Sequence, residues 1–339
     1  MVLEVLKIIR VCSQKKIRQK KREGAVVNLE KIERSHFSYS DIPTFFKFPH
    51  SKELHNVNVA MVGVPLDQAT TNRAGTRFGP RSIRLASQMY GAEFHDGEGI
   101  FDVELGQFIL DGMRAIDYGD IPIFPTMTEL NIQSIEKITK EIIDAHVLPV
   151  IFGGDHSISY PIVKAFSNEK LDIIQFDTHL DFANDTGGLG MIYSHGNPIK
   201  RISELGNIGQ ITQIGIRGLL NDKNTFLEAK KFGTKIITTQ QVFEKDLNWV
   251  IGEIPQSKNI YVTIDIDVFD PSIAPGTGTP EPGGLSYFQV KQLLTALPTK
   301  GRILGFDLVE VNPLYDSGEI TSQLAARITL DFLGAIMDH

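Results

Sequence analysis

Residues 260–267 read IYVTIDID, an apolar and largely β-branched run that ends in two carboxylates. A run that is apolar at almost every position is typical of a strand with both faces buried, as in a parallel sheet. Comparable runs lie at residues 57–64, 147–152, 171–177, 211–216, 235–239 and 303–309. Helical patterns lie between them, at residues 127–145, 226–232 and 287–297. This alternation of strands and helices predicts a doubly wound α/β domain.

The length and composition fit one large domain preceded by an extension. The chain has 339 residues, of which 42% are hydrophobic and 22% charged, as in ordinary globular proteins. Residues 15–22 are strongly basic, which suits either a helical or floppy extension or a tether to nucleic acid or lipid. We expect an N-terminal extension over residues 1–50 and one folded domain over residues 51–339.

The charge, the hydropathy and the cysteine count exclude several classes of protein. The formal net charge is −7, so no global basic field attracts nucleic acid. No stretch approaches the roughly 18 apolar residues that would cross a membrane. Cys12 is the only cysteine and cannot form an internal disulfide, which fits a reducing compartment. We therefore expect a cytoplasmic protein without nucleic-acid or membrane partners.

Polar and acidic residues directly follow four of the predicted strands. They lie at residues 153–157, 177–181, 265–270 and 310–313. Ligands of open parallel sheets bind at the carboxyl ends of the strands. The sequence therefore predicts that four strands contribute to one site.

Three of these segments carry residue types that bind metal ions. They are Gly153-Gly154-Asp155-His156-Ser157, Asp177-Thr178-His179-Leu180-Asp181 and Asp265-Ile266-Asp267. The two glycines permit a sharp turn that places His156 at a strand tip. Residues two apart in extended backbone face the same side, so we expect Asp177 and His179 to point together. The same spacing predicts that Asp265 points with Asp267.

The charges of this site predict a pair of metal ions. The candidate ligands are four carboxylates and two imidazoles, those of Asp177, Asp181, Asp265, Asp267, His156 and His179. The carboxylates would repel one another and take up protons at the ends of buried strands, and two divalent cations would compensate them. The mixed ligand set favours Mn²⁺, Ni²⁺, Co²⁺ or Fe²⁺ over Mg²⁺. Each motif alone also fits a turn or a helix cap, but their joint occurrence after strands favours the metal site.

These segments resemble the ureohydrolase superfamily, which includes arginase, agmatinase, guanidinobutyrase and formimidoylglutamase. The resemblance spans residues 57–335 and is closest to the agmatinase-like branch. Besides the three metal-binding segments, it rests on Gly75-Thr76-Arg77-Phe78-Gly79-Pro80, Ser194-His195-Gly196, the segment 265–284 and Glu310-Val311-Asn312-Pro313. The one departure inside these signatures is Thr178, where alanine is commoner, and this departure removes no ligand.

The resemblance implies a fold and a metal centre. The fold is the three-layer α/β/α architecture of the arginase/deacetylase type, with a mostly parallel central sheet and a binuclear site at the carboxyl ends of its strands. One metal ion would take His156, Asp177, Asp181 and Asp265, and the other would take Asp177, His179, Asp265 and Asp267. Asp177 and Asp265 would then bridge the two ions. We expect Mn²⁺, with Ni²⁺ as the alternative.

The resemblance also implies an activity, the hydrolysis of a guanidino compound to urea and an amine. Metal-activated water would attack the guanidino carbon, and Asp181 would orient it and relay its proton to the leaving amine. Glu310 would hold the guanidinium by charge-assisted hydrogen bonds, and His195 would shuttle protons at the cleft mouth. The alternatives are a helix cap or core ion pair for Glu310 and an ordinary loop histidine for His195.

The expected substrate is agmatine, a small cationic guanidino compound that would yield putrescine and urea. Ala183 and Asn197 stand where the resemblance would place the asparagine and glutamine of an arginase, so arginase ranks lower, as does formimidoylglutamase. Free guanidine, guanidinobutyrate or another guanidino acid stay open as substrates. Residues 187–190 are glycine-rich and would form either a mobile lid or a turn. Members of the superfamily usually form trimers or hexamers, so we expect a homo-oligomer.

Two hypotheses outside this class remain, and metal stoichiometry separates them. A ureohydrolase binds two metal ions per chain, a deacetylase-like amidohydrolase binds one, and a non-catalytic binding protein on the same fold needs none. The complete set of candidate ligands favours the first hypothesis.

Overall fold

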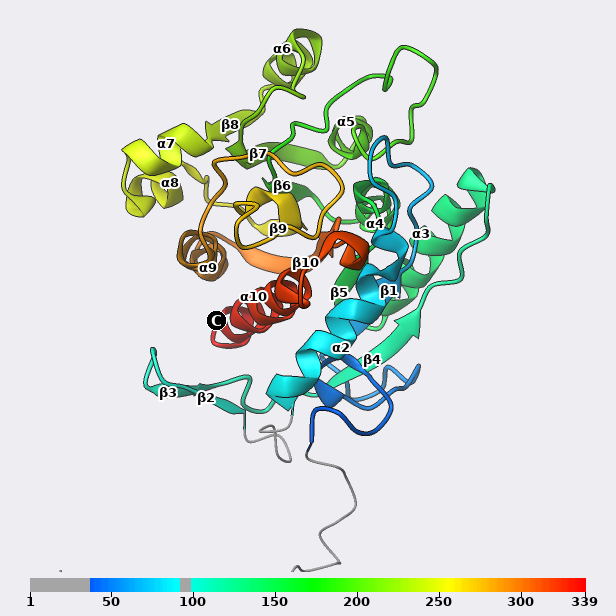
Figure 1. Cartoon of the computed structure of the whole chain (residues 1–339), viewed down its shortest axis with the longest axis vertical. Coiled ribbons are helices and arrows are strands. Elements are labelled where there is room, and N and C mark those ends of the chain that lie inside the picture. The colour runs from blue at the N-terminus through cyan, green and yellow to red at the C-terminus, as the bar shows by residue number, and fades with distance from the viewer. Residues whose placement is uncertain (1–36, 92–98) are drawn as a thin grey trace, which may run out of the picture. The chain divides into compact units, whose positions relative to one another are not determined.

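One parallel sheet of eight strands forms the centre of the computed structural model, which describes residues 37–91 and 99–339. The strands run in the order β4-β1-β5-β10-β9-β6-β7-β8, and every neighbouring pair is parallel (Figure 1). Their bounds are β1 Val59–Val64, β4 Ala115–Asp120, β5 Leu148–Gly153, β6 Leu171–Phe176, β7 Ile208–Ile216, β8 Lys235–Thr238, β9 Asn259–Asp265 and β10 Arg302–Val309. The predicted parallel α/β fold is confirmed.

The seven predicted strands are present, and six of them are buried along most of their length, whereas the edge strand β8 has one buried residue. All seven residues of β9 are buried, as its continuous apolar run predicts. The edge strand β4 was not predicted, because Asp117 and Asp120 interrupt its apolar pattern. A separate antiparallel hairpin of β2 (Ile100–Asp102) and β3 (Gln107–Ile109) was not predicted either.

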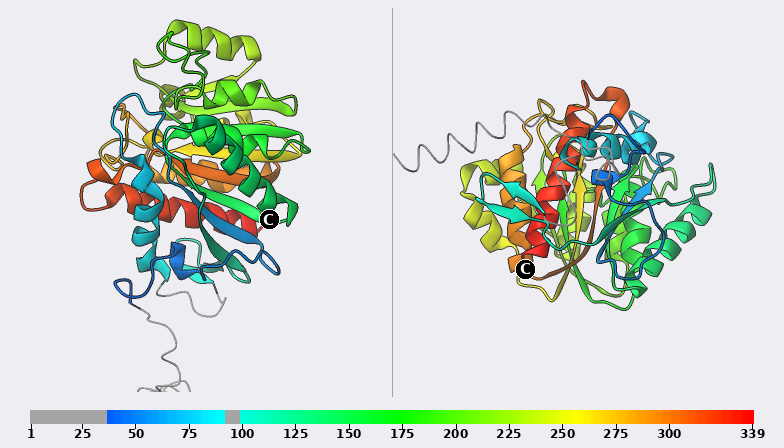
Figure 2. Two further views of the ribbon diagram at one scale, coloured as in Figure 1. Left: turned by 90° about the vertical axis from the view of Figure 1, so that its right-hand side faces the viewer. Right: turned by 90° about the horizontal axis from the view of Figure 1, so that it is seen from below.

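Helices cover both faces of the sheet and complete three layers (Figure 2). Their bounds are α2 Gly79–Gly91, α3 Thr128–Asp144, α4 Ser159–Lys164, α5 Pro198–Ser203, α6 Lys223–Phe232, α7 Thr239–Glu244, α8 Leu247–Glu253, α9 Tyr287–Ala296 and α10 Ile320–Met337. The buried side chains of α2, α7, α8, α9 and α10 belong to one hydrophobic core. Those of α3, α4, α5 and α6 belong to a second core. The two cores flank the sheet and hold it rigid.

Short 3-10 helices mark the loops between these elements. They are η2 Phe45–Lys47, η3 Thr76–Phe78, η4 His156–Ile158, η5 Ile266–Val268, η6 Leu297–Thr299 and η7 Pro313–Tyr315. The long helices lie close to their predicted positions, but α6 begins three residues before the predicted start at residue 226. The reason is that the Asp222 side chain accepts from the backbone N–H groups of Asn224 and Thr225 and caps the helix there.

The segment before β1 contributes to the core. Phe45, Phe46 and Phe48 are buried, and the Phe45 ring centroid lies 4.8 Å from that of Phe152. These residues fall inside the predicted extension 1–50, and Phe37–His339 form one compact unit. We therefore propose that the domain begins before Phe45 and not at residue 51. The basic stretch 15–22 lies outside the described residues.

No helix of the described segments is both long and apolar enough to span a lipid bilayer.

Candidate metal centre

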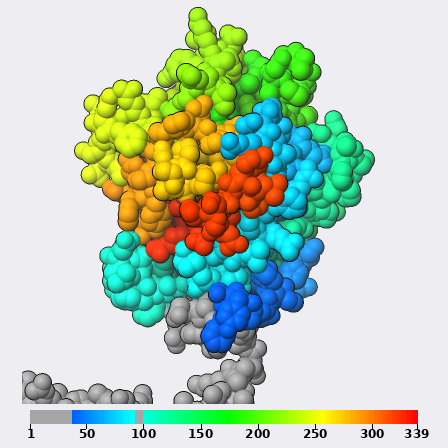
Figure 3. Space-filling view, viewed as in Figure 1, coloured from blue at the N-terminus to red at the C-terminus, as the bar shows by residue number. Residues whose placement is uncertain are grey.

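The four strands that were predicted to share a site are neighbours in the sheet. Strands β5, β10, β9 and β6 occupy its centre in that order, so their carboxyl ends meet. The segments that follow β1, β9 and β10 lie side by side on the face shown in Figure 3. Asn72 Nδ2 donates to Gly278 O at 2.8 Å, and Asn312 Nδ2 donates to Arg73 O at 3.1 Å. These bonds close the loops around the strand ends.

His156 reaches the site because the chain turns sharply after β5. A Cβ on Gly154 would lie 2.2 Å from the carbonyl oxygen of Leu66, so only glycine fits at this position. Asp155 then accepts from the backbone N–H of Ser157 and starts η4. The resulting turn buries the His156 side chain at the strand tip, as predicted.

The local geometry of the two acidic motifs differs from the prediction. The backbone is not extended across them: β6 ends at Phe176, and η5 begins directly after Asp265. His179 N donates to Asp177 Oδ1 at 2.6 Å, and Asp267 N donates to Asp265 Oδ1 at 2.9 Å. An aspartate that accepts the N–H two residues on makes a tight turn. These turns, rather than strand alternation, bring the side chains together.

All six predicted ligand residues meet at one place. His156 Nδ1 lies 2.9 Å from Asp181 Oδ2, 3.1 Å from Asp177 Oδ2 and 3.4 Å from Asp265 Oδ2. His179 Nδ1 lies 3.2 Å from Asp267 Oδ2 and 3.6 Å from Asp177 Oδ1. Two clusters of potential ligand atoms result, one of His156, Asp177 and Asp265 and one of Asp177, His179 and Asp267, and Asp181 lies beside the first cluster. Asp177 thus presents one carboxylate oxygen to each histidine.

The crowding of carboxylates around His156 indicates that this donor set fits metal ions. His156 Nδ1 is buried and makes no well-formed hydrogen bond, although three carboxylate oxygens lie 2.9–3.4 Å from it. Divalent cations held by imidazole nitrogens and carboxylate oxygens would satisfy these atoms. The residues present therefore fit a binuclear centre.

The shifted pKa values in the cluster also fit a site for bound cations. Burial raises the pKa of Asp265 well above its usual value, and the charges of Asp267 and Asp177 raise it further. Burial and the charge of Asp177 likewise raise the pKa of Asp181 to about 6. Burial alone would lower the pKa of His156, but the surrounding carboxylates hold it well above its usual value. The protein thus concentrates negative charge that only cations or protons can compensate.

Several supporting side chains were not found from the sequence. His156 Nε2 lies 2.9 Å from Thr263 Oγ1, whose hydroxyl donates to Asp307 Oδ1 at 2.5 Å. Gln175 Nε2 donates to Asp177 Oδ2 at 2.6 Å. Such partners fix the orientation of metal ligands. Their signal in the sequence was a polar residue inside an apolar strand, two positions before an aspartate.

Glu310 has one carboxylate oxygen occupied and one free. It directly follows β10, with a positive φ of 64° that turns the chain into the site. Its Oε1 accepts from His156 N at 2.9 Å and lies 3.1 Å from His195 Nδ1. Its Oε2 is buried and has no partner among the described residues. The first oxygen anchors the side chain, and the second is available to a cationic ligand.

His195, which was predicted to lie at the mouth of the cleft, lies beside Glu310. Burial alone would lower the pKa of His195, but the hydrogen bond and the charge of Glu310 raise it to about 9. Its side chain is 11% exposed, so the ring borders both the buried cluster and the solvent side. This position suits the predicted transfer of protons at the mouth of the site.

Replacing His195 with asparagine should lower the turnover number by about 100-fold, in the range for loss of a proton-transfer group. The metal content should be unchanged, since His195 does not belong to either ligand cluster. Steady-state urea release and metal analysis of the same preparation measure both quantities. Unchanged turnover would remove His195 from the mechanism.

Two further acidic residues, Asp185 and Glu228, have partners within the fold. Asp185 accepts from the backbone N–H groups of Leu189, Gly190 and Met191 at 3.1, 2.7 and 3.0 Å. It therefore closes the glycine-rich loop upon itself. Glu228 pairs with Lys200 at 3.4 Å.

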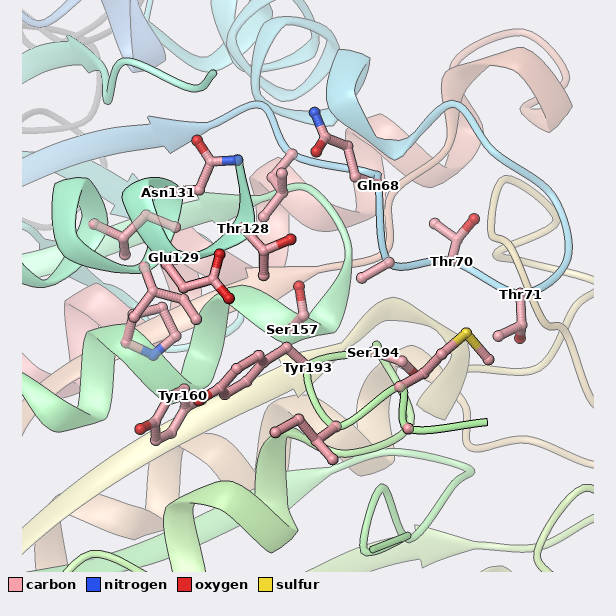
Figure 4. A pocket seen from close by; sticks show the side chains of 18 residues that line it. Gln68, Thr70, Thr71, Thr128, Glu129, Asn131, Ser157, Tyr160, Tyr193 and Ser194 are labelled. Atoms are coloured by element: carbon pink, nitrogen blue, oxygen red, sulfur yellow. The ribbon is translucent and has the colours of Figure 1, made fainter. Parts of the chain in front are cut away.

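The cluster opens into a cavity of about 280 Å³. Its inner wall contains His179, Asp181, His195 and Asp265, and its outer wall contains Asp185 and Asp222. No lysine or arginine of the described chain lines it. A second cavity, of about 430 Å³, lies against the same loops (Figure 4). Thr71 lines both cavities.

Comparisons with known proteins agree with this geometry. Residues 57–334 match the model of the arginase family. Proclavaminate amidinohydrolase of Streptomyces clavuligerus is 34% identical over 315 residues, which cover 90% of this chain and 96% of that protein. Guanidinopropionase of Pseudomonas aeruginosa is 34% identical and covers 87% and 92%, respectively. The solved structure of a hypothetical agmatinase from Burkholderia thailandensis has a TM-score of 0.77 at 30% identity, and the match covers 88% of this chain and 92% of that one.

Proposed function

The chain belongs to the arginase family, and on that premise we propose that it hydrolyses agmatine to putrescine and urea. It is a hydrolase of guanidino C–N bonds, as its relatives are. The observation that supports a cationic substrate is the cavity beside the metal cluster. Asp185 and Asp222 line its outer wall, and no basic side chain of the described residues does. A carboxylate at the distal end of a guanidino acid would meet negative charge there.

The two aspartates retain capacity for a distal amine. Each carboxylate has about four acceptor positions. Asp222 uses three of them, for Asn224 N, Thr225 N and Thr225 Oγ1. Asp185 also uses three, for the backbone of the glycine-rich loop. An ammonium group needs one well-placed acceptor and the favourable field of both charges.

The six ligand residues would hold two divalent ions, most suitably Mn²⁺. Ions bound there act as Lewis acids and make water a nucleophile at neutral pH. Glu310 Oε2 would accept a hydrogen bond from the guanidinium and orient its carbon towards the cluster. Asp181, which lies 2.9 Å from His156 and also lines the cavity, would take the proton of the attacking water and pass it to the departing amine nitrogen.

Free guanidine is the second candidate substrate, and a specific observation favours it. The glycine-rich loop is tied back onto Asp185 and borders the cavity at Gly187. A cavity of about 280 Å³ with a closed outer loop also suits a compound without a distal chain. Agmatine ranks first because both outer carboxylates would then have a role.

We expect the purified protein, loaded with Mn²⁺, to release urea from agmatine. The value of kcat/KM for guanidinobutyrate and guanidinopropionate should be lower than that for agmatine by about 100-fold or more, because their carboxylates would be buried without a positively charged partner. Arginine, guanidine and Ni²⁺-loaded protein complete the comparison. A preference for guanidine would select the second candidate, and a preference for a guanidino acid would refute the assignment of this acidic cavity to a cationic substrate. The absence of both urea and bound metal would refute the proposed reaction itself.

A further inference from the structure

The two ring nitrogens of His195 face different surroundings. Nδ1 lies 3.1 Å from Glu310 Oε1, on the side of the metal cluster. Nε2 faces Thr71, whose backbone N–H donates to it at 3.1 Å and whose Oγ1 lies 2.8 Å away. Thr71 is exposed, although the ring it contacts is mostly buried. Thr71 is thus an exposed partner of the Nε2 atom.

The backbone N–H and the side-chain hydroxyl of Thr71 differ in their capacity to form hydrogen bonds. A backbone N–H can only donate, so it pairs with Nε2 while that nitrogen carries a lone pair. In the neutral form of the ring, which is the minor form below its raised pKa, the proton stays on Nδ1 and is donated to Glu310. A hydroxyl can donate or accept, so Thr71 Oγ1 can partner Nε2 in both of its protonation states. The hydroxyl therefore permits a proton to arrive at Nε2 or to leave it.

The position of Thr71 is fixed by its neighbours and not by its own hydroxyl. Ala69 N donates to Asp155 Oδ2 at 3.0 Å, and His195 N donates to Ala69 O at 3.2 Å. On the other side, Asn72 Nδ2 donates to Gly278 O at 2.8 Å. The segment 69–72 is thus tied to three other loops. Removing the Thr71 hydroxyl should leave the backbone N–H in place beside Nε2.

Thr71 also has access to water on two sides. It lines the cavity of about 280 Å³ next to the metal cluster and the second cavity of about 430 Å³. Figure 4 shows it at one end of the second cavity, with Glu129 and Tyr160 at the other end. A proton delivered to Thr71 Oγ1 can therefore come from solvent without crossing the substrate site.

We propose that Thr71 is a positioning residue for His195 and that its hydroxyl carries protons between solvent and Nε2. This inference rests on the proposed function. In the inward direction, water gives a proton to Thr71 Oγ1 while the hydroxyl gives its own proton to Nε2. Asp181 gives the departing nitrogen its first proton, and Nδ1 then gives the released amine its second, so that it leaves as an ammonium ion. In the outward direction, the protonated urea gives a proton back to Nδ1, and Nε2 returns one to solvent through Thr71 Oγ1, so no net proton is gained or lost in one turnover.

Replacing Thr71 with valine tests the role of the hydroxyl, because valine keeps the shape and the backbone N–H. In the Mn²⁺-loaded enzyme, kcat should fall by about 10-fold or more, while KM changes by less than about twofold. Serine at this position should restore kcat, since it restores the hydroxyl. Added imidazole buffer should raise kcat of T71V but not of the wild type, because it replaces the missing proton carrier. Thr70→Val is the matched control. Thr70 lines the second cavity but not the first, and its side chain makes no hydrogen bond with the described residues.

Three results would overturn the inference: equal kcat for T71V and wild type, equal loss in T71V and T71S, or a loss in T71V that imidazole does not relieve. If the wild type releases no urea from any compound, the proposed function fails separately. The exchange of the His195 ring proton, followed by NMR in protein labelled with ¹⁵N-histidine, then decides the role of Thr71. We expect slower exchange in T71V than in wild type and T70V, and equal exchange rates would refute the role.

Discussion

Asp265→Asn should abolish binding of at least one of the two metal ions and lower urea release by about 1000-fold or more, equivalent to losing about 4 kcal/mol of transition-state stabilisation. Asp265 is 3% exposed and lies at the end of the central strand β9. Its Oδ2 lies 3.4 Å from His156 Nδ1, and its Oδ1 accepts from Asp267 N. Asparagine keeps the shape and the turn but removes the negative charge with which Asp265 would help to hold the metal ions.

Metal analysis and urea release on the same preparation measure this prediction. Asp331→Asn is the matched control, because Asp331 is a similarly buried aspartate, 5% exposed, on α10. Its carboxylate pairs with Tyr287 and Arg327 and takes no part in the ligand clusters. We expect this control to retain two metal ions and its activity. A D265N protein that also keeps two ions and full activity would contradict the proposed centre.

Glu310→Gln should lower kcat/KM by about 100-fold, equivalent to about 3 kcal/mol, the upper range for a hydrogen bond to a charged group. Glu310 is 1% exposed, and its Oε2 is the free acceptor that would face the guanidinium. Glutamine can still accept from His156 N through its carbonyl oxygen. Glutamine cannot supply negative charge to a cationic substrate. The variant should therefore bind both the substrate and the transition state more weakly.

The metal content separates this effect from damage to the centre. E310Q should retain two metal ions, because Glu310 belongs to neither ligand cluster. Glu169→Gln is the matched control, since Glu169 accepts from Asn259 Nδ2 at the amino end of β9, opposite the site. Wild-type kcat/KM in E310Q would remove Glu310 from substrate binding. A loss of metal in E310Q would instead assign it to the metal centre.

The physiological metal, the oligomeric state and the cellular location stay predictions. The expectation of Mn²⁺ rests on the ligand types and the family, and the expectation of a trimer or hexamer rests on the family resemblance alone. Metal analysis of the protein as purified tests the first expectation, and mass measurement in solution tests the second.

The segments and residue types of the site followed from the sequence alone. Buried parallel strands carry continuous apolar runs, so their positions and order along the chain are visible in the residues themselves. The chemistry of aspartate and histidine directly after such strands identifies a metal site because charge at a buried strand end needs compensation. Both signals are local, and each can be read within about ten residues.

Only the tertiary structure decided how these segments meet. β10 lies between β5 and β9, and Glu310 therefore reaches His156 across 154 positions of the chain. Thr71 contacts His195 across 124 positions, and neither residue carries a pattern that predicts the other. The order of strands in the sheet is set by the packing of helices on both of its faces, which sums contacts over the whole domain. The same packing closes the aspartate turns and aligns Thr71 with His195, so these contacts exist only once the two cores have formed.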